Sequence, residues 1–511
     1  MPRYKKYSYA QSRLIPISFS SQILPGTFEY ALNYLIDNEL DVSTFDHFYT
    51  NDETGAPAYD PAILLKIILY AYSRGISSSR EIARQCEQNV VFMALSADTR
   101  PHFTTIAGFI SKMGDEIIHL FRNVLLICDD MGLISKEMFA IDGCKLPSNA
   151  SKEWSGTRED FDKKHRKMEK EIRRIVKRHK DLDVSAKGTD EYKREQKQVE
   201  TLRKKARKLK KWLAENDDKR SRAGNVVKSN TTDNESAKMK TSHGVIQGYN
   251  GVVAVDAKHQ VVVHAEAFGE AQENHLLQPM VKGVRNNFKA IRSHGTDVFK
   301  TAKLSADSGF HTEDNMEYLS IEKIDGYVAD TLFRKRDPRF ATAKRHKPKN
   351  NKKKAKRFTP TDFIYDPETL TCICPAGCSL YLKNRNFHSR GHHAVAFQAR
   401  ESDCRSCRMK PRCLKDPKQK TPRQVHFFSG KTMAGHETYT DKMKRKIDSI
   451  KGRCLYSMRL ATAEPVFGQI KWAKKLNRFT LRGEGKVNIQ WRLYCIVHNI
   501  GKIFRYGPEF A

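Results

Sequence analysis

The sequence contains no run of about 18 apolar residues, the length that a helix needs to cross a membrane. Its first residues, MPRYKKYSYAQSR, have no apolar stretch behind the basic ones, so no secretory signal is expected. Proteins that stay inside the cell keep their thiols reduced. The 11 cysteines are therefore expected to be free thiols or metal ligands rather than disulfides.

Acidic residues are scarce relative to basic ones. The 511 residues include 59 Asp and Glu against 92 Lys and Arg, and 92 − 59 gives a net charge of +33. Such an excess implies a polyanionic partner, with DNA or RNA the first candidates. With 39% hydrophobic residues the chain is too apolar to be a disordered basic tail. Its length suits roughly three or four domains.

Helical patterns fill roughly the first 135 residues. Residues 62–73 form an apolar run long enough for a buried helix. Ser78 and Glu81 have the spacing of a capping box, which predicts a helix over 78–95, and a further helix is expected over 104–131. Short helices joined by tight turns fit a helix-turn-helix-like DNA-binding domain, and they fit a plain helical scaffold equally well.

The pattern changes to strands after residue 137. Residues 138–146 predict a buried strand, 251–269 a β-hairpin, and 302–307 and 325–330 two further strands. A helix is expected over 273–287, between the hairpin and the next strand. This order predicts an α/β fold with a mixed sheet.

Two strongly charged segments interrupt these patterns. Residues 161–222 favour helix but have few apolar positions, which fits either a solvated helical pair or a basic arm lying on DNA. Residues 334–358 have almost no apolar content and are expected to form a flexible basic loop. The chain becomes helical again after about residue 453, and its final helix is expected over 487–504 with one apolar stripe.

Two aspartates stand where a metal site needs them. Asp142 and Asp307 each fall at or near the end of a predicted strand. Carboxylates at strand ends can converge at one edge of a sheet, and two or three of them bind Mg²⁺. Asp256, Asp330 and Glu266 compete for the same role, and composition and spacing alone do not decide among these acids.

A third acid, Glu464, lies in a helical pattern. Pro465 directly after it indicates that the helix starts or kinks there. Seven residues at about 100° each return nearly to the starting direction, so Lys471 is expected on the same helical face as Glu464. Lys475 falls on that face too. One helix would then offer a carboxylate to a metal and ammonium groups to a phosphate backbone.

Six cysteines cluster between residues 372 and 413. Their spacing is C-x-C-x₃-C followed by C-x₂-C-x₅-C, and thiolates at such spacing favour tetrahedral Zn²⁺. Six thiols exceed the four that one site needs, His392 and His393 could substitute for some of them, and a set of free thiols is the alternative. The six are Cys372, Cys374, Cys378, Cys404, Cys407 and Cys413.

Three motifs, in this order along the chain, carry a family resemblance. IDGCKLPSNAS, LSADSGFHTEDN and YSMRLATAEPVFGQIK resemble the catalytic signature of bacterial insertion-sequence transposases of the DDE class. The stretch from YDPAILLKIILYAYSRG to HFTTIAGF is similar to the InsH-type N-terminal domain of one branch, which also has a cysteine-bearing insertion. GYNGVVAVDAKHQVVV resembles the family's second and third strands.

The resemblance implies an RNase H-like catalytic core that binds two Mg²⁺ ions through two aspartates and a glutamate. Carried over, these are Asp142, Asp307 and Glu464. The family's Tyr-Arg-Glu-Lys cluster would be Tyr456, Arg459, Glu464 and Lys471, and the family's insertion favours Cys374, Cys404, Cys407 and Cys413 as ligands of a structural Zn²⁺.

We therefore expect an α/β protein that acts as a DDE transposase on DNA, with element terminal inverted repeats and target DNA as partners. At least a dimer is expected where two ends are joined, in a cytoplasmic, nucleoid-associated setting without a membrane. A catalytically silent DNA-binding copy is the alternative function. The expected domains are 1–136, a helical DNA-binding domain; 137–150 with 224–335 and 450–511, the RNase H-like core; 151–223, a basic helical arm; and 336–449, a basic loop with a small zinc-binding insertion.

Overall fold

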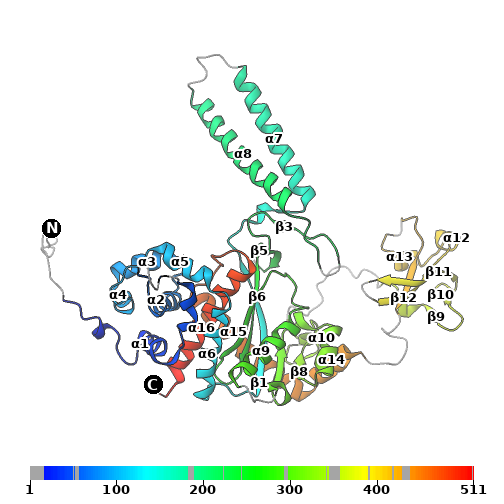
Figure 1. The fold of residues 1–511 in the computed structure, drawn as a ribbon. Coiled ribbons are helices and arrows are strands. Elements are labelled where there is room, and N and C mark those ends of the chain that lie inside the picture. The colour runs from blue at the N-terminus through cyan, green and yellow to red at the C-terminus, as the bar shows by residue number, and fades with distance from the viewer. Residues whose placement is uncertain are drawn as a thin grey trace, which may run out of the picture. The chain divides into compact units, whose positions relative to one another are not determined.

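The computed structural model divides into two compact units (Figure 1). One consists of Met1–Asp330 with Ser449–Ala511, and the other of Thr331–Asp448. No helix in the described part of the chain is long and apolar enough to cross a membrane. The structure describes residues 16–49, 51, 57–181, 189–221, 224–242, 244–292, 297–340, 342–343, 357–389, 392–416, 419–428, 438–508 and 510.

The chain begins with short helices, as expected. The apolar run at 62–73 forms a helix whose N-terminus is capped by Asp60, whose carboxylate accepts from the Ala62 N–H at 2.7 Å. The α-helices of this segment are α1 (Phe28–Tyr34), α2 (Pro61–Ser73), α3 (Ser79–Gln88), α4 (Val90–Leu95), α5 (Phe103–Lys112) and α6 (Glu116–Asp130), and shorter helical turns are η1 (Ser20–Gln22), η2 (Leu35–Glu39) and η3 (Ser43–Phe48).

Two of the predicted helices here are each interrupted, although their outer ends agree with the structure to within a residue. The predicted capping box does not form: the Ser78 side chain makes no capping hydrogen bond, and Glu81 pairs with Arg84. The expected helix over 78–95 breaks at Asn89, whose side chain caps α4. The expected helix over 104–131 is also two helices, α5 and α6, separated at residues 113–115.

A six-stranded mixed sheet forms the centre of the first unit. Strand β5 lies between β6 and β1 and runs antiparallel to both, whereas β1, β7 and β8 are parallel. The short β4 pairs with the start of β5. The order across the sheet is therefore β6-β5-β1-β7-β8. The strands are β1 (Met138–Pro147), β4 (Ala237–Thr241), β5 (Gly244–Asp256), β6 (Val262–Phe268), β7 (Lys303–Ala306) and β8 (Asp325–Val328).

Helices α9, α15 and α16 pack directly on this sheet. The last of them covers β6 and also contacts α2 and α6, where Tyr72 and Tyr494 stack with ring centroids 4.6 Å apart. Two buried asparagines of α16 bind the backbone of β6. Asn499 accepts from the Val262 N–H and donates to its carbonyl, both at 2.8 Å. The helices here are α9 (Leu277–Ile291), α10 (Glu313–Ile321), α15 (Ile450–Gly468) and α16 (Glu484–Tyr506), with the turns η6 (Val298–Lys300), η7 (Ser308–Phe310) and η10 (Gln469–Ala473).

Between β1 and β4 the chain forms the expected pair of charged helices. Helices α7 (Arg158–Lys180) and α8 (Asp190–Glu215) lie side by side as a hairpin (Figure 1). Their contact surface is a narrow apolar seam that includes Phe161 and Trp212, with ring centroids 4.7 Å apart. The short turn η4 (Lys152–Trp154) and the two-stranded sheet of β2 (Ser155–Gly156) and β3 (Ser229–Asn230) lie at the base of the hairpin.

The second unit contains an antiparallel sheet that the sequence analysis did not predict. Its strand order is β13-β12-β11-β10-β9, and Phe363, Cys372, Phe397 and Phe427 are among the residues of its core. The middle of the predicted basic loop, residues 344–356, lies outside the described residues. The elements are α11 (Phe333–Arg336), η9 (Pro360–Asp362), β9 (Ile364–Asp366), β10 (Thr371–Ile373), β11 (Ser379–Ser389), β12 (His392–Gln398), α12 (Glu401–Arg405), α13 (Lys410–Cys413), β13 (Gln424–Phe428) and α14 (Tyr439–Asp448).

Candidate active site

Asp142 and Asp307 lie next to each other on neighbouring parallel strands. The pairing of β1 with β7 ends at Ile141 and Ala306. Asp307 directly follows the end of β7, as expected, whereas Asp142 lies in the middle of β1 rather than near its end. Asp142 is 13% exposed and Asp307 37% exposed. The register of two parallel strands thus brings together two carboxylates that are 165 positions apart in the sequence.

Arg459 of α15 binds both carboxylates. Its guanidinium forms an ion pair with Asp142 through Nη1, and Nη2 lies 3.3 Å from Oδ1 of Asp307. The ring of Tyr456, one turn earlier, lies 5.7 Å from the guanidinium carbon. Arg459 is only 5% exposed, so it reaches the aspartates from within the protein. The sequence analysis assigned Arg459 and Tyr456 to DNA, whereas here the arginine binds the two acids.

The ion pair with Arg459 alone would lower the pKa of Asp142, but the surroundings of Asp142 raise it. Burial raises the pKa of Asp142 to about 6. Arg459 opposes this rise in pKa, while the negative charge of Asp307 adds to it. The Asp142 carboxyl is therefore a group whose charge depends strongly on which cations are nearby.

Glu464, the third predicted acid, lies just over one turn beyond Arg459 on α15. Its side chain is exposed, and within the described part of the chain it forms no hydrogen bond or ion pair with either aspartate. Pro465 does not start the helix, because α15 begins at Ile450 and continues through Pro465. Pro465 has no backbone N–H to donate to the Ala461 carbonyl, one turn earlier in the helix. That carbonyl instead accepts from the Gln260 side chain at 2.9 Å.

The two predicted lysines lie at different places. Lys471 lies near Cys144 of β1, two residues past Asp142. Burial raises the pKa of the Cys144 thiol to about 12, and the positive charge of Lys471 opposes this rise. Lys475 packs its stem against the turn at Gly75, where a Cβ would lie 2.8 Å from its Cδ. Lys471 lies within the π-helical turn η10 and Lys475 lies beyond its end, so the two do not share one regular helical face with Glu464.

Glu273 is a further acid at this site, which the sequence analysis missed. It lies in the turn between β6 and α9 and accepts from the Asn250 amide at 3.2 Å. Burial raises its pKa, and the charges of Asp307 and Arg459 both act on it. The sequence signal was available, because Glu273 closely follows a predicted strand. It was read instead as the first residue of a helix, which actually begins at Leu277.

Two of the competing acids, Asp256 and Glu266, have structural roles. Asp256 is fully buried and accepts from the backbone N–H groups of Ser135, Lys136 and Lys258. Glu266 faces His264, with 3.5 Å between their polar atoms. These contacts account for both side chains without a metal or a substrate.

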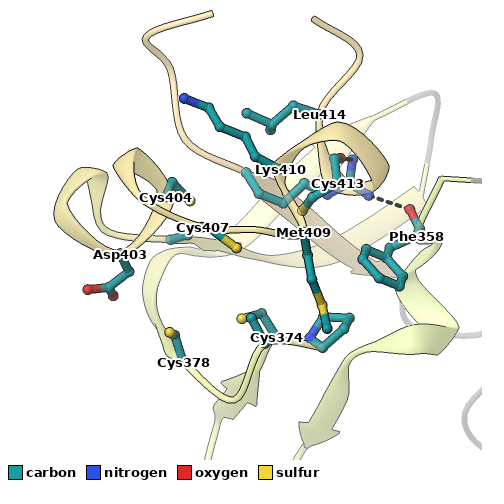
Figure 2. Close-up of a pocket in the computed structure, with 14 residues that line it drawn as sticks. Phe358, Cys374, Cys378, Asp403, Cys404, Cys407, Met409, Lys410, Cys413 and Leu414 are labelled. Atoms are coloured by element: carbon teal, nitrogen blue, oxygen red, sulfur yellow. Dashed lines mark hydrogen bonds between the residues drawn. The ribbon is translucent and has the colours of Figure 1, made fainter. Parts of the chain in front are cut away.

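The cysteine cluster forms one pocket in the second unit. Figure 2 shows the side chains of Cys374, Cys378, Cys404, Cys407 and Cys413 around it. Cys374 and Cys378 lie at the two ends of the turn between β10 and β11, where the Cys374 N–H donates to the Cys378 carbonyl at 2.9 Å. Cys404 and Cys407 come from α12 and the turn after it, and Cys413 from the end of α13.

Cys372 does not line this pocket. It is fully buried in the core of the second sheet, and burial raises the pKa of its thiol to about 11. Five of the six clustered thiols thus face one pocket. In the described residues, however, no three His, Cys, Asp or Glu side chains are arranged as a metal ion requires, either here or at the aspartates.

The fold and the first site define an α/β protein with paired aspartates on a mixed sheet. Comparison with protein families adds two matches. Residues 373–504 match a family described as "Transposase DDE domain", and residues 18–112 match a "Transposase domain (DUF772)". The first match includes Arg459 and Glu464 but neither aspartate. No curated protein matches the chain. Together, these two matches indicate an insertion-sequence DDE transposase.

Proposed function

We propose that the protein binds the ends of a mobile DNA element and catalyses Mg²⁺-dependent strand cleavage and strand transfer. The observation that carries the proposal is the pair Asp142 and Asp307, adjacent on parallel strands and neutralised by the buried Arg459. Two aspartates that share a metal ion must stay close together when the metal ion is absent. A buried guanidinium such as that of Arg459 would keep them close, and the metal ion would be the second, exchangeable cation.

The strand order also supports an RNase H-like core. Three parallel strands, β1, β7 and β8, are extended by two antiparallel ones, β5 and β6, and the acids lie where β1 and β7 separate. Of the proposed core, 137–150, 224–335 and 450–511, all but residues 331–335 belong to the unit that contains the acids.

The side chains at the site have the chemistry that Mg²⁺ prefers, since carboxylate oxygens are its usual protein ligands. Asp142, Asp307 and Glu464 would hold it. When bound, Mg²⁺ polarises a phosphoryl oxygen and lowers the pKa of a bound water or hydroxyl. Arg459 orients the two aspartates, and Lys471, beside β1, binds a phosphate of the scissile strand. No protein nucleophile is needed.

DNA contacts in the proposal come from several basic surfaces. The best defined is on α8, where residues 201–214 contain seven basic side chains and no acidic one. Arg203, Lys204 and Arg207 are exposed and form no ion pair within the described residues. We assign this face to the DNA backbone, together with the N-terminal helices and Lys475. The protein acts as a dimer or larger oligomer on two ends, in the nucleoid.

A structural Zn²⁺ held by Cys374, Cys404, Cys407 and Cys413 completes the proposal. The support is the convergence of thiols from a β-turn and two short helices on one pocket (Figure 2). Thiolate ligands from a tight turn and a C-x₂-C segment suit tetrahedral Zn²⁺. The zinc would add its coordination bonds to the small apolar core of this sheet.

Strand cleavage on a labelled element-end duplex with Mg²⁺ tests the function. Wild type should nick at the end, while Asp307→Asn and Glu464→Gln should bind the duplex without cutting it. Glu266→Gln, a half-buried acid on the same sheet, is the control and should cut normally. If the wild type binds tightly but never cuts with Mg²⁺ or Mn²⁺, the chain is a DNA-binding relic. If the two variants cut as well as wild type, the catalytic assignment is wrong.

A further inference from the structure

Two glycines next to the catalytic aspartates leave space for the Glu273 carboxylate. A Cβ on Gly143, the residue after Asp142, would lie 3.3 Å from Oε1 of Glu273. A Cβ on Gly309, two residues after Asp307, would collide with Oε2 of the same carboxylate. The two oxygens of Glu273 thus lie against the backbone that follows each aspartate.

A buried amide at the same place has one oxygen without a partner. Asn250 of β5 is fully buried, and its Nδ2 donates to Glu273. Its Oδ1 has no hydrogen-bond partner in the described structure and lies 2.9 Å from the Cβ position of Gly143. A buried carbonyl oxygen without a donor is costly, so such an atom calls for a ligand. It lies against Gly143, the residue after Asp142, and is a hard oxygen donor of the kind that Mg²⁺ and Mn²⁺ prefer.

From this arrangement we propose that Glu273 is a ligand of the divalent cation at the Asp142–Asp307 site. The inference rests on the proposed function and adds a carboxylate from a third segment of the chain, the turn between β6 and α9. Arg459 holds the two aspartates in the structure described here. Glu273 forms no ion pair within the described residues, and its carboxylate accepts from Asn250, so it would offer the cation a further carboxylate.

The alternative is that Glu273 only accepts the Asn250 hydrogen bond and stabilises the turn. Glu273→Gln separates the two roles, because a glutamine oxygen still accepts from Asn250 while the negative charge is lost. The matched control is Glu266→Gln, since Glu266 is also a half-buried carboxylate of the same unit and its ion-pair contact is with His264.

The experiment is Mn²⁺ binding to the full-length protein without DNA, followed by the electron paramagnetic resonance of free Mn²⁺. Asp142→Asn and Asp307→Asn define the loss expected for a ligand. Glu273→Gln should weaken Mn²⁺ binding by at least about tenfold, as ligand-shell changes do, and Glu266→Gln should leave it unchanged. Gly309→Ala, which displaces the Glu273 carboxylate without altering charge, should also weaken binding.

Localised cleavage gives a second readout. With Fe²⁺, ascorbate and peroxide, hydroxyl radicals should cut the wild-type backbone near residues 142, 273 and 307, and Glu273→Gln should lose these cuts while its circular dichroism stays that of wild type. If Glu273→Gln binds Mn²⁺ like wild type while the aspartate variants do not, this inference is wrong and the proposed function stands. If wild type binds no Mn²⁺ with or without element-end DNA, both fail.

Discussion

Arg459 and Asp142, 317 positions apart in the sequence, form an ion pair in the interior of the first unit. Arg459 comes from a helix and Asp142 from the strand beneath it, so the pair joins α15 to the sheet. Both side chains are almost fully buried, at 6% and 13% exposure. Because neither charge can be solvated without the other, the pair fixes the position of α15 over the two aspartates.

Removal of Arg459 should therefore destabilise the protein. Arg459→Leu leaves the buried Asp142 without a cation, and breaking such a pair raises the free energy of folding by about 3–5 kcal/mol. Denaturant unfolding should show this loss, and Asp142→Asn/Arg459→Leu should lose less than the sum of the two single variants. Arg84→Leu, which breaks an exposed pair with Glu81 on α3, is the control and should change little. Equal stability of wild type and Arg459→Leu would show that the pair does not form in solution.

Lys474 should make the stability depend on pH. Burial, reinforced by the charge of Lys502, lowers the pKa of Lys474 to about 8, whereas an unfolded lysine titrates near 10.4. Between these values the unfolded state holds the proton and the folded state does not, so stability rises with pH from about 8 to about 10.4. Below pH 8 the folded state carries the buried charge.

Lys474→Met removes that charge. The variant should be more stable than wild type by up to about 3 kcal/mol at pH 7, and this gain should shrink as the pH rises through 9 and 10. Urea unfolding at three pH values measures the difference. Lys475→Met, at the exposed neighbouring position, is the control. A gain that is the same at pH 7 and pH 10 would rule out a buried charged Lys474.

The sequence was informative where local pattern and structure coincide. Strand periodicity located β1, β5 and β7, so Asp142 and Asp307 could be expected to meet, and parallel register brings them together. The apolar stripe of the last helix was also evident. The role of its buried asparagines was not evident, because Asn499 hydrogen-bonds to a strand that lies 237 positions away in the sequence. No local pattern records a bond of that kind.

The same reason explains the missed features of the site. Glu273 gains its role from two glycines and an amide on other elements, and only the fold brings these together. Pro465 looked like a helix start, yet Gln260 satisfies the carbonyl that the proline leaves free. The second sheet was missed because its strands are short and lie among cysteines and basic residues that suggested loops.

Zinc content provides a direct test of the cysteine pocket. Full-length protein purified without chelators should contain about one zinc ion per chain, measured by plasma mass spectrometry. Cys404→Ser/Cys407→Ser should remove it and destabilise the second unit. Cys454→Ser, at an exposed cysteine of α15, should retain it. If Cys378→Ser keeps its zinc, the four proposed ligands suffice. If it loses the zinc, Cys378 is a ligand as well. A metal-free wild type would contradict the zinc assignment.

The basic face of α8 should account for part of the salt dependence of DNA binding. Each DNA phosphate that the protein no longer neutralises lowers the slope of log Kobs against log salt by about 0.9. Arg203→Gln/Lys204→Gln/Arg207→Gln should therefore lower the slope by roughly 3, because these side chains are exposed and have no acidic partner within the described residues.

The matched control removes three positive charges from α7. Lys163, Arg166 and Arg174 pair with Glu159, Asp162 and Glu171 on their own helix, so replacing them with glutamine frees three acids and leaves the DNA-facing side chains in place. Filter binding of a duplex between 50 and about 200 mM salt measures both slopes. If the two triple variants lower the slope equally, net charge rather than the α8 face governs binding, and the hairpin is a solvated pair of helices.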